Sequence, residues 1–337
     1  MSVTEAPKSI HSTSGPIKWI SNEDVFRVLT WDRLLPAIRS ALVAYTQGPN
    51  HPHGAVQPLR TTIEAPQNQG VMIVMPGLVK KEGAMAVKTL TSIQNAQLGL
   101  CITSAIVQLM DSTTGCTTAI LQGEALTELR TAAASAVATL EILRGRDVPK
   151  DGHDGTIVAV LGAGAQGRSH ARVMTHILKP KKIMLWARRP EAAKALCATL
   201  QSEGIPAEVA ATVQEAVKDA DVINNCTSTS TPILKAEWVK PRAHVNSVGA
   251  HAPNKQEMEE DLVRAATIYA DSYESAQREA GDIIKSGATV FAEIGEVILG
   301  TKPVLNDKIT IFKSLGLAVE DVVSAQLVYQ CLKTEEQ

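Results

Sequence analysis

The chain has 337 residues, of which 45% are hydrophobic and only 3% are aromatic. At ~150 residues per domain this length predicts two globular domains, whose cores must consist mainly of Ala, Val, Leu and Ile. The formal net charge of -2 gives no electrostatic attraction to nucleic acid or to an anionic membrane, so we expect neither as a partner.

The N-terminal segment and the cysteines indicate a cytoplasmic protein. Residues 1–16 are polar and lack the basic start and apolar stretch of a signal peptide, and no run approaches the ~20 apolar residues of a membrane span. Five cysteines are scattered without a CxxC pair or a nearby His at zinc spacing, which favours reduced thiols and no metal site. We expect residues 1–20 to form a mobile tail.

The part of the chain that follows has the patterns of an α+β domain. Ser21 is suited to cap a short helix, and a second helix is expected over Trp31–Gln47. Short β-rich runs alternate with turn residues over 55–110, and Asp111–Cys116 has the composition of a turn between paired strands. A long Ala-rich helix over Gly123–Arg144 then carries the chain toward a second domain.

From Thr156 onward strands and helices alternate. Strands are expected at Thr156–Leu161, Lys182–Trp186, Val209–Ala211, Val222–Asn225, His244–Val248 and Thr267–Ala270. This alternation predicts a parallel, doubly wound sheet and therefore an α/β fold. Helical patterning returns from Ala318 to Leu332, after the sheet is complete, and we expect this last helix to pack on the first domain.

A glycine-rich turn follows the first of these strands and opens a helix. Its residues are Gly162, Ala163, Gly164, Ala165, Gln166 and Gly167, in the pattern GxGxxG. Between a strand and a helix this pattern is typical of dinucleotide binding, because the second glycine lets the backbone approach the pyrophosphate and the helix N-terminus offers unpaired N–H groups. The sequence therefore predicts a Rossmann domain.

The end of the next strand indicates which dinucleotide is bound. An NAD site normally has Asp or Glu there, which binds the 2′-hydroxyl of the ribose. Here Trp186 is followed by Ala187, Arg188 and Arg189, and a guanidinium group matches the oxygens of a 2′-phosphate. We predict NADPH as the cofactor, with NADH the less favoured alternative.

Several blocks, in the same order, resemble the ornithine cyclodeaminase and mu-crystallin family. They are QPLRTT (57–62), LRTAAASAVAT (129–139), VLGAGAQGRSHA (160–171), WVKPRAHVNSVGAHAP (238–253), AEIGEVILG (292–300) and FKSLGLAVED (312–321). The chain looks closest to the mu-crystallin branch, whose members act as NADPH-dependent ketimine reductases and bind thyroid hormone. The resemblance implies a homodimer with a Rossmann domain, residues 130–310, inserted into an α+β substrate and dimerisation domain, residues 21–129 and 311–337.

The resemblance also implies the residues of both sites. Arg60, Lys88 and Arg130 correspond to the family's substrate-carboxylate residues, and a bidentate Arg orients a planar carboxylate well. Gly316 is expected as a further substrate contact, and Lys88, Arg130 and His251 as the catalytic group. The rest of the cofactor wall is expected at Cys226, Thr227, Ser228, Val248, Gly249 and Ser314.

His251 stands where cyclodeaminases carry Asp. A neutral imidazole cannot hold a substrate ammonium group by charge, but it can move a proton near pH 7. We therefore predict NAD(P)H-dependent reduction of cyclic or N-substituted 2-imino acids to L-amino acids, with His251 as the proton donor. The alternatives are an NAD-dependent ornithine cyclodeaminase or alanine-type amino-acid dehydrogenase, and a non-catalytic protein that binds NADPH or thyroid hormone.

Overall fold

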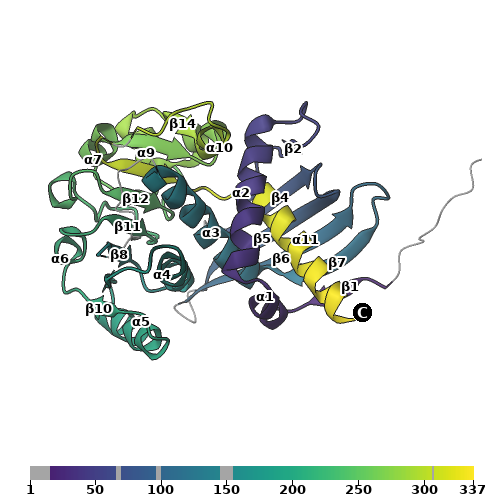
Figure 1. The fold of residues 1–337 in the computed structure, drawn as a ribbon, viewed down its shortest axis with the longest axis horizontal. Helices are drawn as coiled ribbons and strands as arrows, with labels where there is room; N and C mark the ends of the chain where they lie inside the picture. The colour runs from purple at the N-terminus through teal and green to yellow at the C-terminus, as the bar shows by residue number, and fades with distance from the viewer. Residues whose placement is uncertain (1–15, 66–69, 96–99, 145–154, 306) are drawn as a thin grey trace, which may run out of the picture.

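The computed structural model describes residues 16–65, 70–95, 100–144, 155–305 and 307–337. Two sheets lie side by side, with helices between and around them (Figure 1). Most of the predicted N-terminal tail lies outside the described residues. Lys18–Ile20, however, form strand β1, which pairs in parallel with β7, so the predicted tail of residues 1–20 is wrong at its end.

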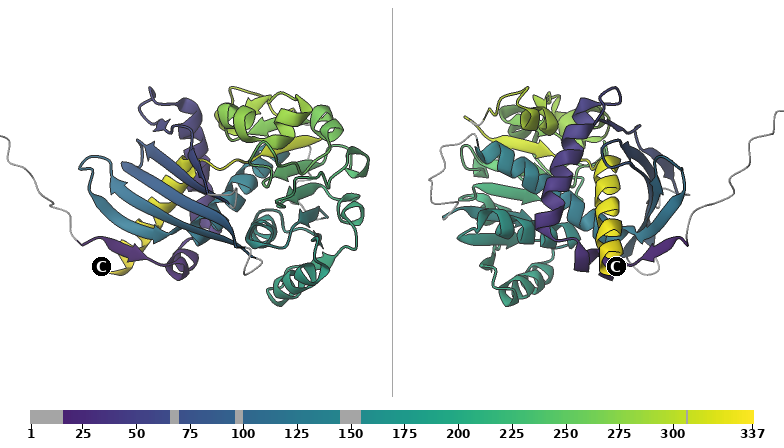
Figure 2. Two further views of the ribbon diagram at one scale, coloured as in Figure 1. Left: turned by 180° about the vertical axis from the view of Figure 1, so that it is seen from behind. Right: turned by 45° about the vertical axis from the view of Figure 1, so that its right-hand side comes forward.

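The first sheet is mixed, with the order β1-β7-β6-β5-β4-β2 and with β3 paired to β4. Its strands are β1 (Lys18–Ile20), β2 (Ala55–Val56), β3 (Thr61–Glu64), β4 (Gly70–Val79), β5 (Ala84–Asn95), β6 (Leu100–Asp111) and β7 (Thr117–Gln122). Side chains alternate between the faces of a strand, so the register partners Lys88 and Val107 both point to the buried inner face. Helix α11 (Ala318–Glu335) covers that face, whereas no helix of the described chain covers the outer face (Figure 2).

Helices α1 (Asn22–Val28) and α2 (Trp31–Gln47) complete this domain with α11. The predicted cap is confirmed, because the hydroxyl of Ser21 accepts a hydrogen bond from the backbone N–H of Asp24 at 3.2 Å. Helix α2 begins and ends at the predicted residues. Val319 and Val322 of α11 belong to the core of this domain, which confirms the predicted return of the last helix.

Helix α3 (Gly123–Arg144) lies between the two sheets and contributes to both cores. Ala133 and Ala138 pack in the core of the first domain, while Ala132 and Ala136 pack in a core of the second. Small side chains on all sides allow neighbouring helices to approach α3 closely. The domain boundary expected between residues 129 and 130 therefore falls inside a continuous helix.

The second sheet is entirely parallel, with the order β10-β9-β8-β11-β12-β15-β13-β14. Its strands are β8 (Ile157–Leu161), β9 (Lys182–Trp186), β10 (Ala207–Val209), β11 (Val222–Asn225), β12 (His244–Ser247), β13 (Thr267–Ala270), β14 (Ala292–Glu293) and β15 (Thr310–Lys313). The helices are α4 (Ala165–Leu178), α5 (Pro190–Ser202), α6 (Val213–Val217), α7 (Glu260–Ala265), α8 (Tyr273–Glu279), α9 (Gly281–Ser286) and α10 (Ile294–Leu299), with a short 3-10 helix at Ala236–Trp238. The strand order reverses between β8 and β11, and ligands of such sheets bind outside the carboxyl ends of the strands at that point.

Strand β15 was not expected, and its position shows that the second predicted domain boundary, after residue 310, is misplaced. It lies between β12 and β13 with all four residues buried, so the sheet is not complete before residue 310 and the boundary expected between residues 310 and 311 cuts a central strand. Lys313 interrupts the apolar pattern that marks a buried strand. Its ammonium group is accommodated inside by a hydrogen bond of 3.1 Å to the hydroxyl of Ser247.

No helix in the part of the chain that the structure describes is long and apolar enough to cross a bilayer.

Candidate functional site

The glycine-rich turn lies between β8 and α4, where the strand order reverses. Gly162 has φ +115°, and a Cβ there would lie 2.6 Å from the carbonyl oxygen of Cys226. A Cβ on Gly167 would lie 1.9 Å from the carbonyl oxygen of Gly162, whereas a Cβ on Gly164 would meet no atom within 4 Å. The first and third glycines are thus required by packing, and the second leaves open space at the N-terminus of α4, as phosphate binding needs.

A cleft of about 260 Å³ opens beside this turn. Its walls include the predicted residues Gly162, Ala163, Gly164, Ala187, Arg188, Arg189, Thr227 and Ser228, together with Trp186, Ala192, Thr229 and Ile233. The predicted residues Ala165, Gln166, Gly167, Cys226, Val248, Gly249 and Ser314 lie outside its lining. Arg188 and Arg189 are exposed, and neither forms an ion pair with any residue that the structure describes. Their positive charge is therefore available to an anionic group in the cleft.

A buried carboxylate, Glu257, joins two predicted stretches of the cofactor wall. Its Oε1 accepts hydrogen bonds from the backbone N–H and the hydroxyl of Thr227, both at 2.7 Å. Its Oε2 accepts from the N–H groups of Gly249 at 2.7 Å and Ala250 at 3.1 Å. Burial raises the pKa of Glu257 to about 7, although the positive charge of Lys313 opposes this rise. The loops after β11 and β12 are thus held together by an acid that the sequence did not single out.

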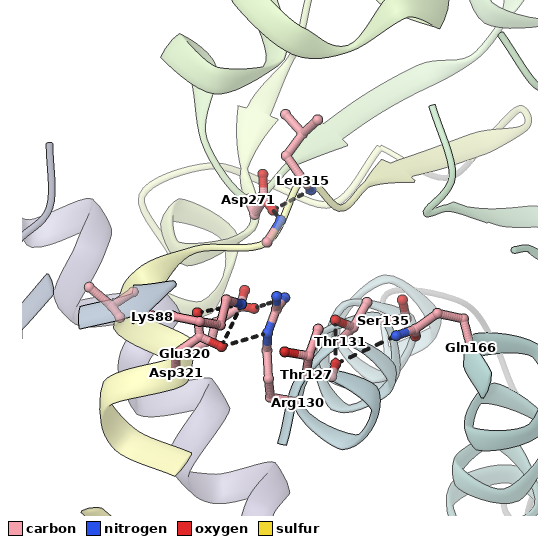
Figure 3. A network of polar contacts seen from close by, with 12 residues as sticks. Lys88, Thr127, Arg130, Thr131, Ser135, Gln166, Asp271, Leu315, Glu320 and Asp321 are labelled. Atoms are coloured by element: carbon pink, nitrogen blue, oxygen red, sulfur yellow. Dashed lines mark hydrogen bonds and ion pairs between the residues drawn. The ribbon is translucent and has the colours of Figure 1, made fainter. Parts of the chain in front are cut away.

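Two of the predicted carboxylate-binding cations, Lys88 and Arg130, lie buried together between the first sheet and α3 (Figure 3). The ammonium group of Lys88 is 2.8 Å from a carboxylate oxygen of Asp321. Arg130 donates from Nε to Asp321 at 3.1 Å and from Nη1 to Glu320 at 2.9 Å. Within the described residues Nη2 of Arg130 has no hydrogen-bond partner. Among the three guanidinium nitrogens it is the one that no acid of the cluster pairs with.

Burial shifts the pKa values of this cluster. It lowers the pKa of Lys88 to about 8, with a further contribution from the charge of Arg130, and it raises the pKa of Glu320 to about 7. At pH 7 Lys88 therefore remains protonated. The cluster keeps both cations charged while its acids hold them in place.

The loop after β15 passes directly over Arg130. Gly316 has φ +83°, and a Cβ there would lie 2.6 Å from Nη1 of Arg130. Asp271, which is buried, accepts the N–H groups of Leu315 at 2.6 Å and Gly316 at 2.8 Å and so fixes the loop (Figure 3). The predicted contact residue Gly316 thus lies against Arg130, and only a residue without a side chain fits there.

Arg60, the third predicted cation, connects the two domains. It precedes β3 and donates to the carbonyl oxygens of Leu315 at 3.2 Å and His251 at 3.4 Å. It also forms an ion pair with Glu279 at the end of α8. Arg60, Glu279 and Gly316 line a cavity of about 10 Å³. The structure therefore places Arg60 beside His251 and Gly316, with an acid already on its guanidinium group.

His251 lies in the loop after β12, and the residue has exposed surface although protein atoms crowd around its imidazole. The pKa of His251 is lowered to about 4. The largest cause is desolvation of the imidazole by the surrounding protein, and the positive charges of Lys313 and Arg60 add to it. The imidazole is therefore neutral at pH 7. A role as proton donor would need a proton that this residue does not carry in the free protein.

The acids of the site, Asp271, Glu257, Glu279, Glu320 and Asp321, were not predicted. Glu320 and Asp321 had a usable signal, because two acids in the first turn of an otherwise apolar helix require cations if that turn is buried. Glu257 stands in a polar run and Glu279 in a charged helix, so nothing in the sequence separates them from surface residues.

Residues 19–336 match the sequence model of the ornithine cyclodeaminase/mu-crystallin family. The chain is 40% identical over 299 residues to the ketimine reductase mu-crystallin of Mus musculus, a match that covers 88% of this chain and 91% of that protein.

Two solved structures have the same fold over nearly their whole length. One is the Δ1-pyrroline-2-carboxylate reductase of Thermococcus litoralis, solved in complex with NADH and L-proline. The match has a TM-score of 0.86 at 29% identity and covers 95% of this chain and 98% of that chain. The other is an archaeal alanine dehydrogenase dimer with bound NAD. This match has a TM-score of 0.83 at 27% identity and covers 95% of this chain and 97% of that chain.

Proposed function

Because the chain belongs to the ornithine cyclodeaminase/mu-crystallin family and is an oxidoreductase acting on C=N bonds, we propose that it reduces cyclic or N-substituted 2-imino acids to L-amino acids with NADPH. The observation that carries the proposal is the position of Lys88 and Arg130. Both are buried and charged at pH 7, and Arg130 lies against the loop after β15, at the same edge of the parallel sheet as the dinucleotide cleft. A small carboxylate substrate and a dinucleotide would therefore bind next to each other.

The residues around the glycine-rich turn fit a nicotinamide dinucleotide. The open space at Gly164 and the N-terminus of α4 would hold the pyrophosphate, and Arg188 and Arg189 would hold a 2′-phosphate. The loops joined by Glu257 would form the remaining wall. When bound, the cofactor supplies the hydride.

The chain's own residues orient the substrate and its charge. Arg130, through its free Nη2, and Lys88 attract the substrate carboxylate and fix its plane. We propose that the imine binds as an iminium ion already protonated in solution, whose N–H donates to the neutral imidazole of His251. The nitrogen then keeps its proton when the neighbouring carbon is reduced, so His251 need not donate one.

We also propose a homodimer, formed through the outer face of the first sheet. Apolar side chains on this face include Trp19, Val74, Val87, Ile106 and Ile120, and Trp19 and Ile106 are 60% and 45% exposed. Exposed apolar surface of this kind marks a protein interface. Four cysteines, Cys116, Cys197, Cys226 and Cys331, are free thiols, which supports a cytoplasmic location.

The proposed function is tested by following the absorbance of NADPH with five- and six-membered cyclic 2-imino acids, with and without ring sulfur. We expect oxidation of NADPH and formation of the cyclic L-amino acid. Saturable NADPH binding without oxidation by any imine would show a binding protein instead. Release of ammonia from ornithine with proline as product would show a cyclodeaminase.

A further inference from the structure

Acids pair with each of the three proposed substrate-binding cations, Arg60, Lys88 and Arg130. These acids differ in how easily they can move away from their cation. Glu320 and Asp321 have side chains that are 0% and 1% exposed, and moving either would strand a buried cation. The carboxylate of Glu279, on Arg60, is 19% exposed. Because the side chain of Glu279 reaches solvent, it can leave Arg60 for water, and an incoming carboxylate keeps the guanidinium group paired.

The surroundings of Glu279 also favour its departure. It is the last residue of α8, where the negative end of the helix dipole disfavours an acid, and Arg60 is its only cation within the described residues. The neighbouring Arg278 pairs with Glu274 instead. The cavity beside the pair, about 10 Å³, has room for a single water molecule. A substrate carboxylate can therefore reach the guanidinium group only if Glu279 moves away.

Arg60 is held independently of Glu279. Its guanidinium group donates to the carbonyl oxygens of Leu315 and His251, at 3.2 and 3.4 Å. These two bonds cross from the first domain to the loops of the second. When Glu279 leaves, Arg60 keeps its position and presents an unpaired charge at the rim of the site.

We propose that Glu279 sets the affinity for substrate: it occupies the guanidinium group of Arg60 in the free enzyme, and the substrate carboxylate binds by displacing it into solvent. This inference rests on the proposed function, since it takes Arg60 as a carboxylate-binding residue. One carboxylate replaces another, and no covalent bond changes. Because the pair must be broken first, substrate binds more weakly than the three cations alone would allow.

The test compares Glu279→Gln with Glu274→Gln, a matched change on the same helix, whose acid forms a surface pair with Arg278. The KM for Δ1-pyrroline-2-carboxylate is measured with saturating NADPH, and the Kd of L-proline by calorimetry on the cofactor complex. We expect Glu279→Gln to lower both constants by about three- to tenfold, and Glu274→Gln to leave them unchanged. Glu279→Asp, which keeps the charge on a shorter side chain, should give intermediate values.

A KM that rises or stays constant in Glu279→Gln, with normal thermal stability, would overturn the inference, because Glu279 would then support Arg60 or be irrelevant to it. If the wild type reduces imines while the Kd of L-proline is unaffected, only this inference fails. If no imine is reduced but Glu279→Gln binds L-proline more tightly, only the proposed function fails. Absence of L-proline binding to both proteins would overturn the displacement of Glu279.

Discussion

Arg188 and Arg189 are exposed on the wall of the dinucleotide cleft and are not neutralised by an acid among the described residues. A guanidinium group in this setting gains a charge-assisted pair when a 2′-phosphate arrives. Arg188→Ala should therefore weaken NADPH binding about tenfold, or ~1.4 kcal/mol, and change NADH binding by less than about twofold. Fluorescence titration with both cofactors measures this. The exposed Lys194 of α5 lies outside the cleft, and Lys194→Ala is the control. An equal loss for both cofactors would contradict a phosphate contact.

His251 offers a second test at the scale of a single residue. A proton donor would lose about 10²–10⁴ in kcat on substitution by Ala, whereas loss of one hydrogen-bond acceptor costs about 0.5–1.5 kcal/mol, or roughly tenfold at most. Because the pKa of His251 is lowered to about 4, we expect the smaller loss in His251→Ala. We also expect no limb near the ordinary histidine pKa of ~6.5 in the wild-type profile. A loss of several hundredfold, growing as the pH rises, would restore the donor role.

The three cations stood out in the sequence and their acid partners were missed, although Glu320 and Asp321 carried a usable signal. The expected role of Arg60, Lys88 and Arg130 follows from the resemblance to the family, and it stays a prediction. The pairing of Arg130 with Glu320 and Asp321 depends on how α3 packs against α11, which involves residues 190 or more positions apart. Sequence spacing carries no information about such a contact. The same holds for Arg60 and Glu279, which are 219 positions apart.

At the scale of elements, Glu257 links the loop after β11 to the loop after β12 by hydrogen bonds to both. Glu257→Gln replaces one acceptor oxygen by an NH₂ group. Where this group faces the N–H groups of Gly249 and Ala250, two hydrogen bonds are lost and buried donors are left unpaired. We expect a loss of about 1–3 kcal/mol in the free energy of unfolding, and a weaker NADPH complex because the cofactor wall separates. Denaturant titration and the NADPH Kd measure the two effects. Glu260→Gln, in a surface pair with Arg264, should change neither. Unchanged NADPH affinity would show that the loops are held by other contacts.

Long periodic elements were predicted well, and the short strands β9, β11 and β13 also have the predicted bounds, whereas the short strands β1 and β15 were missed. Helices α2 and α3 match the predicted bounds because their spacing repeats over many turns. Strand β15 has four residues, one of them Lys313, and its place in the sheet depends on pairing with β12 and β13 on either side. β1 has three residues and depends on β7, about 100 positions away. Periodicity cannot identify strands that are defined by distant partners.

At the scale of the whole molecule, the outer face of the first sheet is the surface we expect a second copy to cover. Ile106 lies on β6 in this face and is 45% exposed. Ile106→Glu would place charges in an apolar interface and should convert the dimer to monomers, as measured by sedimentation velocity. Lys182→Glu, on the far sheet, is the control. A wild-type protein that sediments as a monomer would contradict the proposed interface.

The two-domain plan could be predicted, but its boundaries could not. Alternating strands and helices after residue 156 indicated a parallel sheet, and the helical pattern near the end indicated a return to the first domain. The boundaries fall inside α3 and β15 because both elements serve the two halves at once. Residues of α3 pack in both cores, and the segment that follows β15 leads directly from the parallel sheet to Arg130.

The position of α11 over the inner face of the first sheet has a consequence for synthesis on the ribosome. Strand β7 ends at Gln122 and α11 begins at Ala318, so the ribosome adds about 200 residues between the sheet and the helix that covers it. Translation adds about 5–20 residues per second. During this time α11 does not yet cover the apolar inner face of the nascent sheet, while the Rossmann domain that is synthesised between the sheet and α11 can fold. We therefore expect newly made chains to bind chaperones through this sheet, and release to coincide with the emergence of α11.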